Sequence, residues 1–420
     1  MFPSGFYRNK NGELNVQGLK IDDLTAKYGT PLFIYDTGLM KERYEVFLNT
    51  VKNVKGNIHY AVKANDSVNI IKFFGKLGAG ADIVSIGEFQ KCVAAGISPK
   101  KIIFSGVGKN NDEIEIALRN NILQFNIESE EELYDIYEIA KKLKINANIC
   151  LRINPDIAPN THKKISTGEK ETKFGIDSEK IISIYKKLHE LDYINPYGLG
   201  VHIGSQIFDF SFFQKAYSYL KWIAENLKKS GYNVPALDLG GGIGIHYERD
   251  KKPDFDNYKK IISELFLNSD YKLSFEPGRI LIAEAGILIT KVIRNKKNKD
   301  KEFIVVDAAM NNLIRPTLYD AYHKIETVKI KSGPEKVVDI VGPICETGDY
   351  FALNRKFVEV NNDDLLTIRT AGAYSSVMKS NYNSRVDAVE ILIYNGKSYQ
   401  MKEIDTIQDI ISKEKIIDFL

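Results

Sequence analysis

Lys63 lies in the segment HYAVKAND (residues 59–66), at the end of an apolar run that is typical of a strand. Buried lysines are costly unless they are paired or used in chemistry. A desolvated lysine amine is the nucleophile that forms a Schiff base with an aldehyde. The competing interpretation is a lysine whose ammonium reaches solvent, and Lys63 alone does not separate the two.

A glycine run, Gly240-Gly241-Gly242, with Gly244 two residues on, follows the predicted strand Ala236–Leu239. Consecutive glycines let backbone N–H groups converge on an anion, because no Cβ atom stands in the way. The run lacks the Gly-Lys-Ser/Thr of a P-loop and the GxGxxG order of a dinucleotide loop. It therefore predicts a phosphate site, and a tight turn without ligand is the alternative.

Glu276-Pro277-Gly278-Arg279 ends another predicted strand, because Pro and Gly stop it sharply. A carboxylate such as Glu276 placed against a pyridine nitrogen keeps that nitrogen protonated, which makes the ring an electron sink. Arg279 could hold a substrate carboxylate with two parallel hydrogen bonds. A strand-terminating turn with a surface ion pair is the competing interpretation. Together with Lys63 and the glycines, these residues indicate a site for pyridoxal phosphate.

Further candidates carry weaker signals. His202 in GVHIGSQ could present a flat ring to a planar ligand, and Ser205 could donate to a phosphate, although a lone histidine is more often a core residue. The later part of the chain adds residues that could each be ordinary structure: Arg315 and Tyr319 in RPTLYDAYH, Cys345 and Glu346 in GPICETGD, and Tyr374 after Ala371-Gly372-Ala373. The six histidines form no HxxxH or HxH spacing with acids, so we expect no metal site.

Eight short β-rich runs between residues 26 and 280 alternate with helical patterns and must position these residues. The runs are Ile58–Lys63, Asp82–Ser85, Ile102–Ser105, Leu123–Ile127, Ala147–Ile153, Gly198–Ile203, Ala236–Leu239 and Lys272–Glu276. Helices are expected at 129–143, after a Ser129 cap, and at 212–229. This alternation predicts an α/β fold, a (β/α)8 TIM barrel, with a doubly wound open sheet as the alternative. The candidate residues fall at the carboxyl ends of the strands, the edge that carries the active site in such barrels.

After Arg279 the pattern changes to strand-like pieces at 287–292, 303–306, 337–341, 364–368 and 386–393. We therefore expect two domains: a barrel at 26–280, and a second, mostly-β domain, a β-barrel or sandwich, at 1–25 plus 281–420. The Lys-rich stretch 294–301 is interpreted as a solvated loop between strands.

The composition excludes several classes of protein. Lys plus Arg number 58 and Asp plus Glu 55, so the net charge is +3, and we expect no nucleic-acid partner. The three cysteines form no CxxC pair, which suggests a reducing compartment. No signal peptide or membrane-spanning run is visible, so a cytoplasmic enzyme without a membrane partner is expected.

The residues, taken together, resemble those of diaminopimelate decarboxylase, one of the group III pyridoxal-phosphate decarboxylases, whose fold is similar to that of alanine racemase. The resemblance covers nearly the whole chain and rests on seven ordered motifs: HYAVKAN, HIGSQ, GGGIG, EPGR, RPTLYDAYH, GPICETGD and AGAY. One departure is Thr347, where the family often has serine after Cys-Glu.

The resemblance implies decarboxylation of meso-2,6-diaminopimelate to L-lysine, the last step of lysine biosynthesis. Lys63 would hold the cofactor covalently and Cys345, from the other subunit of a homodimer, would return the proton. Other roles follow for two sets of residues. His202, Ser205, Gly241, Gly242, Glu276, Gly278, Arg279 and Tyr374 would bind the cofactor, and Arg279, Arg315, Tyr319, Glu346 and Tyr374 would bind the substrate. The segment His162–Gly175 resembles the family's active-site lid.

Three alternatives stay open. A decarboxylase of the same fold for ornithine, arginine or carboxynorspermidine would not need the full RPTLYDAYH segment. An alanine-type racemase needs two bases on opposite faces of the ring, and the CETGD motif argues against it. A non-catalytic binding protein would be expected to have lost Lys63 or Cys345, and both are present.

Overall fold

The computed structural model describes residues 3–157, 159, 167–168, 172–247 and 253–417 of the 420-residue chain. The chain divides into two compact units. One comprises Met1–Glu42, Tyr247–Asp250 and Leu281–Leu420, and the other comprises Arg43–His246 and Lys251–Ile280.

The second of these units is a closed barrel of eight parallel strands. Every neighbouring pair is parallel, and β13 pairs with β5 (Phe275 opposite Ile58), which closes the ring. The strands are β5 (Gly56–Ala61), β6 (Gly80–Ile83), β7 (Ile102–Phe104), β8 (Gln124–Ile127), β9 (Ala147–Asn154), β11 (Ile194–Val201), β12 (Ala236–Asp238) and β13 (Lys272–Phe275). The closure confirms the predicted (β/α)8 barrel and excludes the doubly wound sheet, which would have two open edges.

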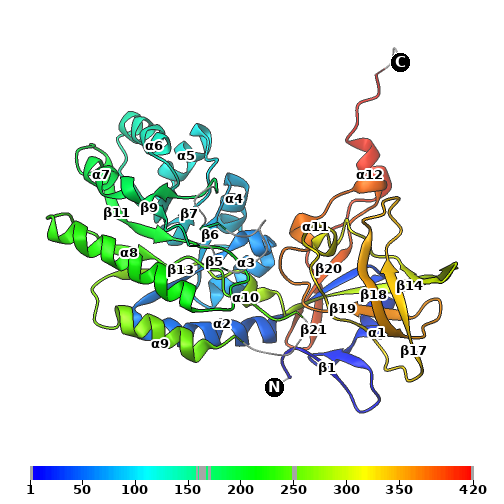
Figure 1. Ribbon diagram of the computed structural model, residues 1–420. Helices are drawn as coiled ribbons and strands as arrows, with labels where there is room; N and C mark the ends of the chain where they lie inside the picture. The colour runs from blue at the N-terminus through cyan, green and yellow to red at the C-terminus, as the bar shows by residue number, and fades with distance from the viewer. Residues whose placement is uncertain (1–2, 158, 160–166, 169–171, 248–252, 418–420) are drawn as a thin grey trace. The chain divides into compact units, whose positions relative to one another are not determined.

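Helices lie around the outside of the barrel, and all but the first of them follow a barrel strand along the chain (Figure 1). They are α2 (Thr37–Val51), α3 (Val68–Lys76), α4 (Ile86–Ala94), α5 (Asn111–Arg119), α6 (Glu130–Leu143), α7 (Ser178–Leu188), α8 (Ser211–Lys229) and α9 (Phe255–Phe266), with the short strand β10 (Ile176–Asp177) beside β9. The two helices expected from the sequence are present as α6 and α8. Ser129 caps α6 as predicted, since its side chain accepts from the backbone N–H of Glu132.

The other unit is mostly β. Its larger sheet has the order β18-β17-β15-β14-β4-β20-β21, with β19 paired to β14 and β16. The strands are β4 (Leu32–Asp36), β14 (Gly286–Asn298), β15 (Lys301–Val306), β16 (Ile325–Thr327), β17 (Glu335–Val341), β18 (Tyr350–Val358), β19 (Leu365–Ile368), β20 (Val389–Tyr394) and β21 (Lys397–Gln400). A small sheet of β1 (Phe6–Arg8), β2 (Leu14–Val16) and β3 (Leu19–Lys20) precedes helix α1 (Ile21–Tyr28). Three further helices are short: α10 (Arg279–Ile282), α11 (Arg315–Tyr319) and α12 (Ile407–Ser412).

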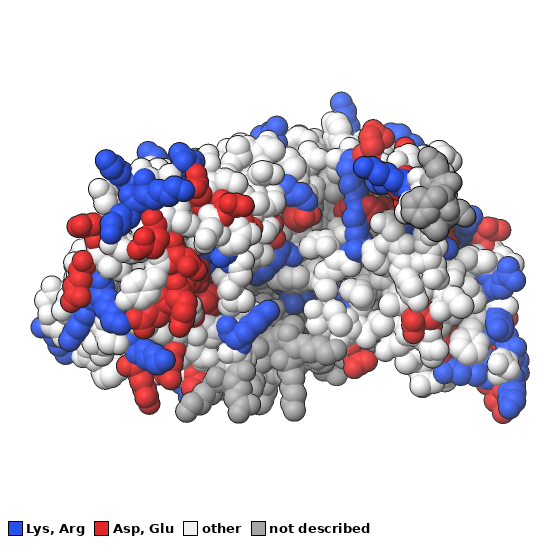
Figure 2. All heavy atoms as spheres, turned by 90° about the horizontal axis from the view of Figure 1, so that it is seen from above, with Lys and Arg blue, Asp and Glu red and all other residues white. Residues whose placement is uncertain are grey.

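The mostly-β unit has its own apolar core, in which Leu14 and Val16 of β2 pack with Leu32 and Ile34 of β4 and with Ile391 of β20. The Lys-rich stretch 294–301, expected to be a loop, instead forms the paired ends of β14 and β15, with Asn298 opposite Lys301. All residues of this stretch are exposed to solvent, as expected, although they belong to strands and the turn between them. Figure 2 shows basic and acidic side chains interspersed over the visible face. No helix in the described part of the chain is long and apolar enough to cross a membrane.

Candidate active site

Lys63 lies in a single 3-10 turn directly after β5, where the chain leaves the barrel. Its ammonium nitrogen is 2.8 Å from Oδ2 of Asp82, the third residue of β6, which is fully buried. The second carboxylate oxygen of Asp82 has no hydrogen-bond partner among the described residues. Neighbouring parallel strands therefore bring an amine and a carboxylate together at one end of the barrel.

A small cavity that opens to solvent lies at this end. Its lining includes three of the predicted residues, Lys63, His202 and Glu276, and six that were not predicted as site residues. These six are Ser105, Asn126, Arg152, Gly200, Val201 and Asp238.

Glu276 follows β13 and is buried beside Asp238, the last residue of β12. Burial first, then the charges of Asp238 and Asp82, raises the pKa of Glu276 well above its usual range. Burial likewise raises the pKa of Asp238. The amide nitrogen of Asn126 lies 3.2 Å from Glu276 Oε1 and 3.0 Å from Asp238 Oδ2. A cation placed against Glu276 would reverse this shift and stabilise the carboxylate.

His202 follows β11 and accepts a hydrogen bond at Nδ1 from the backbone N–H of Gly241 (3.2 Å). Burial, together with the positive charges of Arg152 and Lys63, lowers the pKa of His202 well below its usual value. The imidazole is therefore neutral, and its ring lines the cavity.

The glycine run makes a turn that other residues would not fit. A Cβ atom on Gly241 would lie 2.2 Å from the carbonyl oxygen of Glu276. Gly242 has φ +112°, and a Cβ there would lie 2.2 Å from the carbonyl oxygen of Gly204. Glycine is required here because the backbone of the run lies close to other backbone atoms. A site that binds an anion through backbone N–H groups has the same requirement.

Arg279 begins α10 and is buried, with its guanidinium donating to Ser205 Oγ at 3.1 Å. Gly278, the residue before Arg279, lies close to Ala61 and Ala64. A Cβ atom on Gly278 would lie 3.1 Å from the Cβ of Ala61 and 3.0 Å from that of Ala64. The structure thus brings two of the predicted residues, Arg279 and Ser205, into contact.

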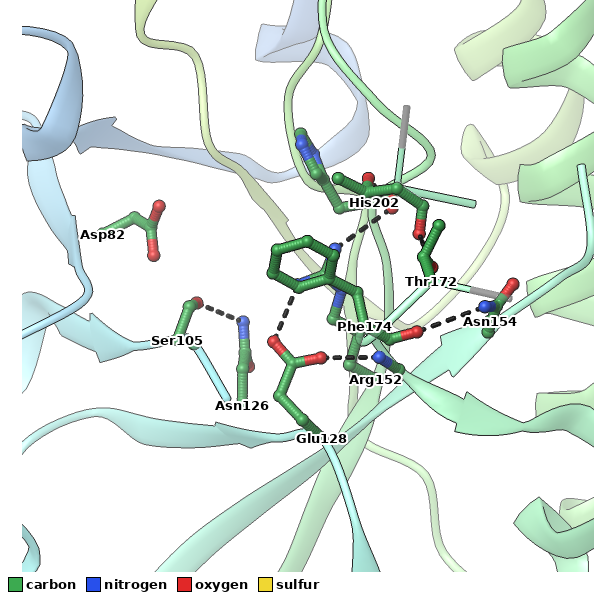
Figure 3. Close-up of polar contacts among 12 residues, drawn as sticks. Asp82, Ser105, Asn126, Glu128, Arg152, Asn154, Thr172, Phe174 and His202 are labelled. Carbon is green, nitrogen blue, oxygen red and sulfur yellow. Dashed lines mark hydrogen bonds and ion pairs between the residues drawn. The ribbon is translucent and has the colours of Figure 1, made fainter. Parts of the chain in front are cut away.

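Arg152 is the most prominent residue that sequence reasoning missed. It is in β9 and donates to Glu128 Oε1 at 2.7 Å, and its guanidinium lies 5.0 Å from the ring centre of Phe174 (Figure 3). The other oxygen of Glu128 accepts from the backbone N–H of Gly175 at 2.7 Å. The sequence feature that could have indicated Arg152 is its position near the end of an apolar strand.

The lid was expected at residues 162–175. Most of it, namely 162–166 and 169–171, lies outside the described residues.

The remaining predicted residues belong to the mostly-β unit. Arg315 and Tyr319 are the first and last residues of α11, and Cys345 and Glu346 lie in the exposed segment between β17 and β18. Thr317 donates to the carbonyl of Gly348 at 2.5 Å, so the two segments are held side by side. Tyr374 has a left-handed backbone, with φ +54°. Within the described residues, no group of three or more His, Cys, Asp or Glu side chains could hold a metal ion.

Comparisons with known proteins identify the family of this chain. Residues 37–283 match the family model described as "Pyridoxal-dependent decarboxylase, pyridoxal binding domain". The chain is 43% identical to a diaminopimelate decarboxylase of Zymomonas mobilis over 98% of this chain and 99% of that one. It is also 43% identical to one from Aquifex aeolicus, over 92% of each. A crystal structure of the Helicobacter pylori diaminopimelate decarboxylase complexed with L-lysine is similar with a TM-score of 0.90 at 38% identity, covering 93% and 98% of the two chains.

Proposed function

The chain belongs to the pyridoxal-dependent decarboxylase family, and from this premise we propose that it is a diaminopimelate decarboxylase. It converts meso-2,6-diaminopimelate to L-lysine and CO2. The observation that carries this conclusion is the similarity to diaminopimelate decarboxylases over nearly the full length of both chains. The cavity at the barrel end, where Lys63, His202 and Glu276 meet, supplies the matching chemistry.

Pyridoxal phosphate fits the residues of this cavity. Lys63 offers an amine to the aldehyde. Gly241 and Gly242, whose close backbone contacts exclude a Cβ atom, would hold the phosphate through backbone N–H groups. Buried Glu276, whose pKa is raised, would be stabilised as a carboxylate by the protonated ring nitrogen of the cofactor. Ser205, Gly278, Arg279 and Tyr374 complete the proposed cofactor contacts.

When bound, the cofactor accepts the electron pair that the departing carboxylate leaves on Cα. The chain's own residues prepare that step. Glu276 would keep a proton on the ring nitrogen, and the neutral His202 ring would lie against the cofactor and keep water away from it. Lys63 holds the cofactor between turnovers, and Cys345 returns a proton to Cα.

Recognition of the far end of the substrate belongs to Arg279, Arg315, Tyr319, Glu346 and Tyr374. In this proposal the arginines meet the carboxylate that does not leave. A substrate without that carboxylate loses its charged contact with the buried arginines, which costs roughly 3–5 kcal/mol. Ornithine, arginine and lysine are therefore poor substrates, and this distinguishes the function from that of the polyamine-type decarboxylases.

We further propose a homodimer in the cytoplasm, with each active site shared by two copies. Cys345 is exposed in the described chain, whereas Cys92 and Cys150 are buried and all three thiols are free. Burial raises the pKa of the Cys92 thiol to about 12, and it also raises the pKa of the Cys150 thiol well above its usual value. Cys345 is thus the cysteine that a second copy could reach.

The test is an assay of CO2 release with pyridoxal phosphate present. We expect kcat/KM for meso-diaminopimelate to exceed that for ornithine, arginine and lysine by about a hundredfold or more. A kcat/KM for ornithine comparable to that for meso-diaminopimelate would instead favour a decarboxylase of the polyamine type. Release of CO2 from none of the four amino acids would overturn the proposed function.

A further inference from the structure

His323 ends the motif RPTLYDAYH and is fully buried in the mostly-β unit. Its Nε2 lies 2.8 Å from a terminal guanidinium nitrogen of Arg315, and its Nδ1 lies 2.8 Å from the carbonyl oxygen of Arg369. His323 therefore bridges α11 and the residue after β19, and none of the roles assigned above includes it.

These two hydrogen bonds of the His323 ring indicate where its proton lies. A guanidinium nitrogen only donates hydrogen bonds, so Nε2 must accept. A carbonyl oxygen only accepts, so Nδ1 must carry the proton. The neutral Nδ1–H tautomer satisfies both contacts at once, and the imidazolium would set an N–H against the N–H of Arg315.

Arg315 is consequently held at two places. His323 accepts from one guanidinium nitrogen, and the ring of Tyr247 lies against the guanidinium plane, 4.4 Å from its central carbon. Tyr247 also meets the His323 ring edge to face, with centroids 5.0 Å apart. A planar guanidinium fixed at one nitrogen and one face is held in a set orientation.

We propose that His323 is a positioning residue that aims the Arg315 guanidinium at the non-reacting carboxylate of the substrate and so contributes to selectivity for a dicarboxylate. This rests on the proposed function, in which Arg315 binds that carboxylate. His323 acts through Arg315 and touches neither the cofactor nor the bond that breaks.

The experiment compares three variants of the pyridoxal-phosphate-loaded enzyme. His323→Leu removes the acceptor, His323→Gln keeps an amide oxygen near the position of Nε2, and His323→Asn is too short to reach it. We expect KM for meso-diaminopimelate to rise about ten- to a hundredfold in the Leu and Asn variants, with kcat little changed, and to recover in the Gln variant. If His323→Leu does not fold, the comparison of Asn with Gln carries the test.

Two competitive inhibitors distinguish a misoriented Arg315 guanidinium from a general disruption of the substrate site. L-lysine carries a carboxylate for Arg315 to meet, and 1,5-diaminopentane does not. The inhibition constant of L-lysine should rise with KM in the Leu and Asn variants, whereas that of 1,5-diaminopentane should stay as in the wild type. His189→Leu, at an exposed histidine after α7 in the barrel unit, is the matched control and should leave both constants unchanged.

The outcomes distinguish the two proposals. A wild-type enzyme that releases no CO2 from diaminopimelate would overturn the proposed function and this inference with it. An active wild type whose His323→Asn variant has an unchanged KM would overturn the inference alone. So would equal weakening of L-lysine and 1,5-diaminopentane, because that would show a collapsed site instead of a misdirected arginine.

Discussion

The ion pair of Lys63 with Asp82 illustrates how single residues prepare the proposed chemistry. Asp82 is fully buried, and a buried carboxylate is costly unless a positive charge compensates it. Lys63 supplies that charge at 2.8 Å, while its side chain keeps 37% of its surface exposed toward the cavity. The amine is thus held by one carboxylate oxygen and still accessible to an aldehyde. The sequence indicated the lysine, but not its partner, because the two are nineteen residues apart.

Replacing Lys63 by Ala should abolish retention of the cofactor. The purified wild-type protein is expected to be yellow, and the Lys63→Ala protein should become colourless on dialysis, because no covalent link holds the cofactor. The absorption spectrum measures this directly. Lys91→Ala is the matched control, since Lys91 is a partly exposed lysine of the same unit that pairs with Asp66, and that variant should remain yellow. A Lys63→Ala spectrum identical to that of the wild type would refute the assignment.

At the scale of elements, the barrel strands were predictable because each is a short apolar run that ends at polar or glycine residues. Strand β11 shows the limit of this reasoning: it begins at Ile194, four residues before the predicted start, because its pairing with β9 continues past Pro196 with a register shift. Strand β4 was missed altogether. All five residues of β4 are buried, so it lacks the alternation that marks a strand, and it pairs with β14 and β20 far along the chain.

Strand β5 also carries a buried histidine that makes the fold sensitive to acid. His59 donates from Nδ1 to the carbonyl of Lys101 at 3.1 Å, and burial lowers its pKa to about 4. In the unfolded chain the imidazole titrates near its ordinary value, so between that value and pH 4 only the unfolded state binds the proton. The free energy of unfolding therefore falls as pH falls through this window, and the contribution is intact above it.

The prediction concerns His59→Asn, whose amide can still donate to the Lys101 carbonyl but does not titrate. Between pH 7 and pH 4.5 the wild type should lose roughly 2 kcal/mol more unfolding free energy than this variant. Urea titrations at the two pH values measure the difference. Equal losses in both proteins would show that His59 is protonated as readily in the folded state as in the unfolded chain.

For the whole molecule, the sequence indicated both units and the closed barrel, because polar residues follow several strands at the same end. It could not indicate the buried polar network of Asn126, Asp238 and Glu276, since those contacts join strands more than a hundred residues apart. Nor could the tautomer of His323 be predicted, because it depends on Arg315 and Arg369 lying on opposite sides of one ring. Both depend on closure of the fold and not on local pattern.

If two copies share each active site, mixing two inactive variants should restore activity, which a self-contained monomer could not do. If Lys63 of one copy works with Cys345 of another, Lys63→Ala and Cys345→Ala should each be nearly inactive, and Cys345→Ala should keep its yellow colour. A mixed dimer would then combine both defects in one site and leave the second site intact. With random exchange half of the dimers are mixed, so about a quarter of wild-type activity should return on mixing.

The measurement is CO2 release after equal amounts of the two variants are mixed and incubated until labelled subunits show complete exchange. Mixing Lys63→Ala with the double variant Lys63→Ala/Cys345→Ala is the control, and no activity should return there, because every site lacks its lysine. An absence of recovery in the main experiment despite complete exchange would place both residues in one copy. Full activity of Cys345→Ala by itself would remove the thiol from the proton transfer, since the acid would then be another group.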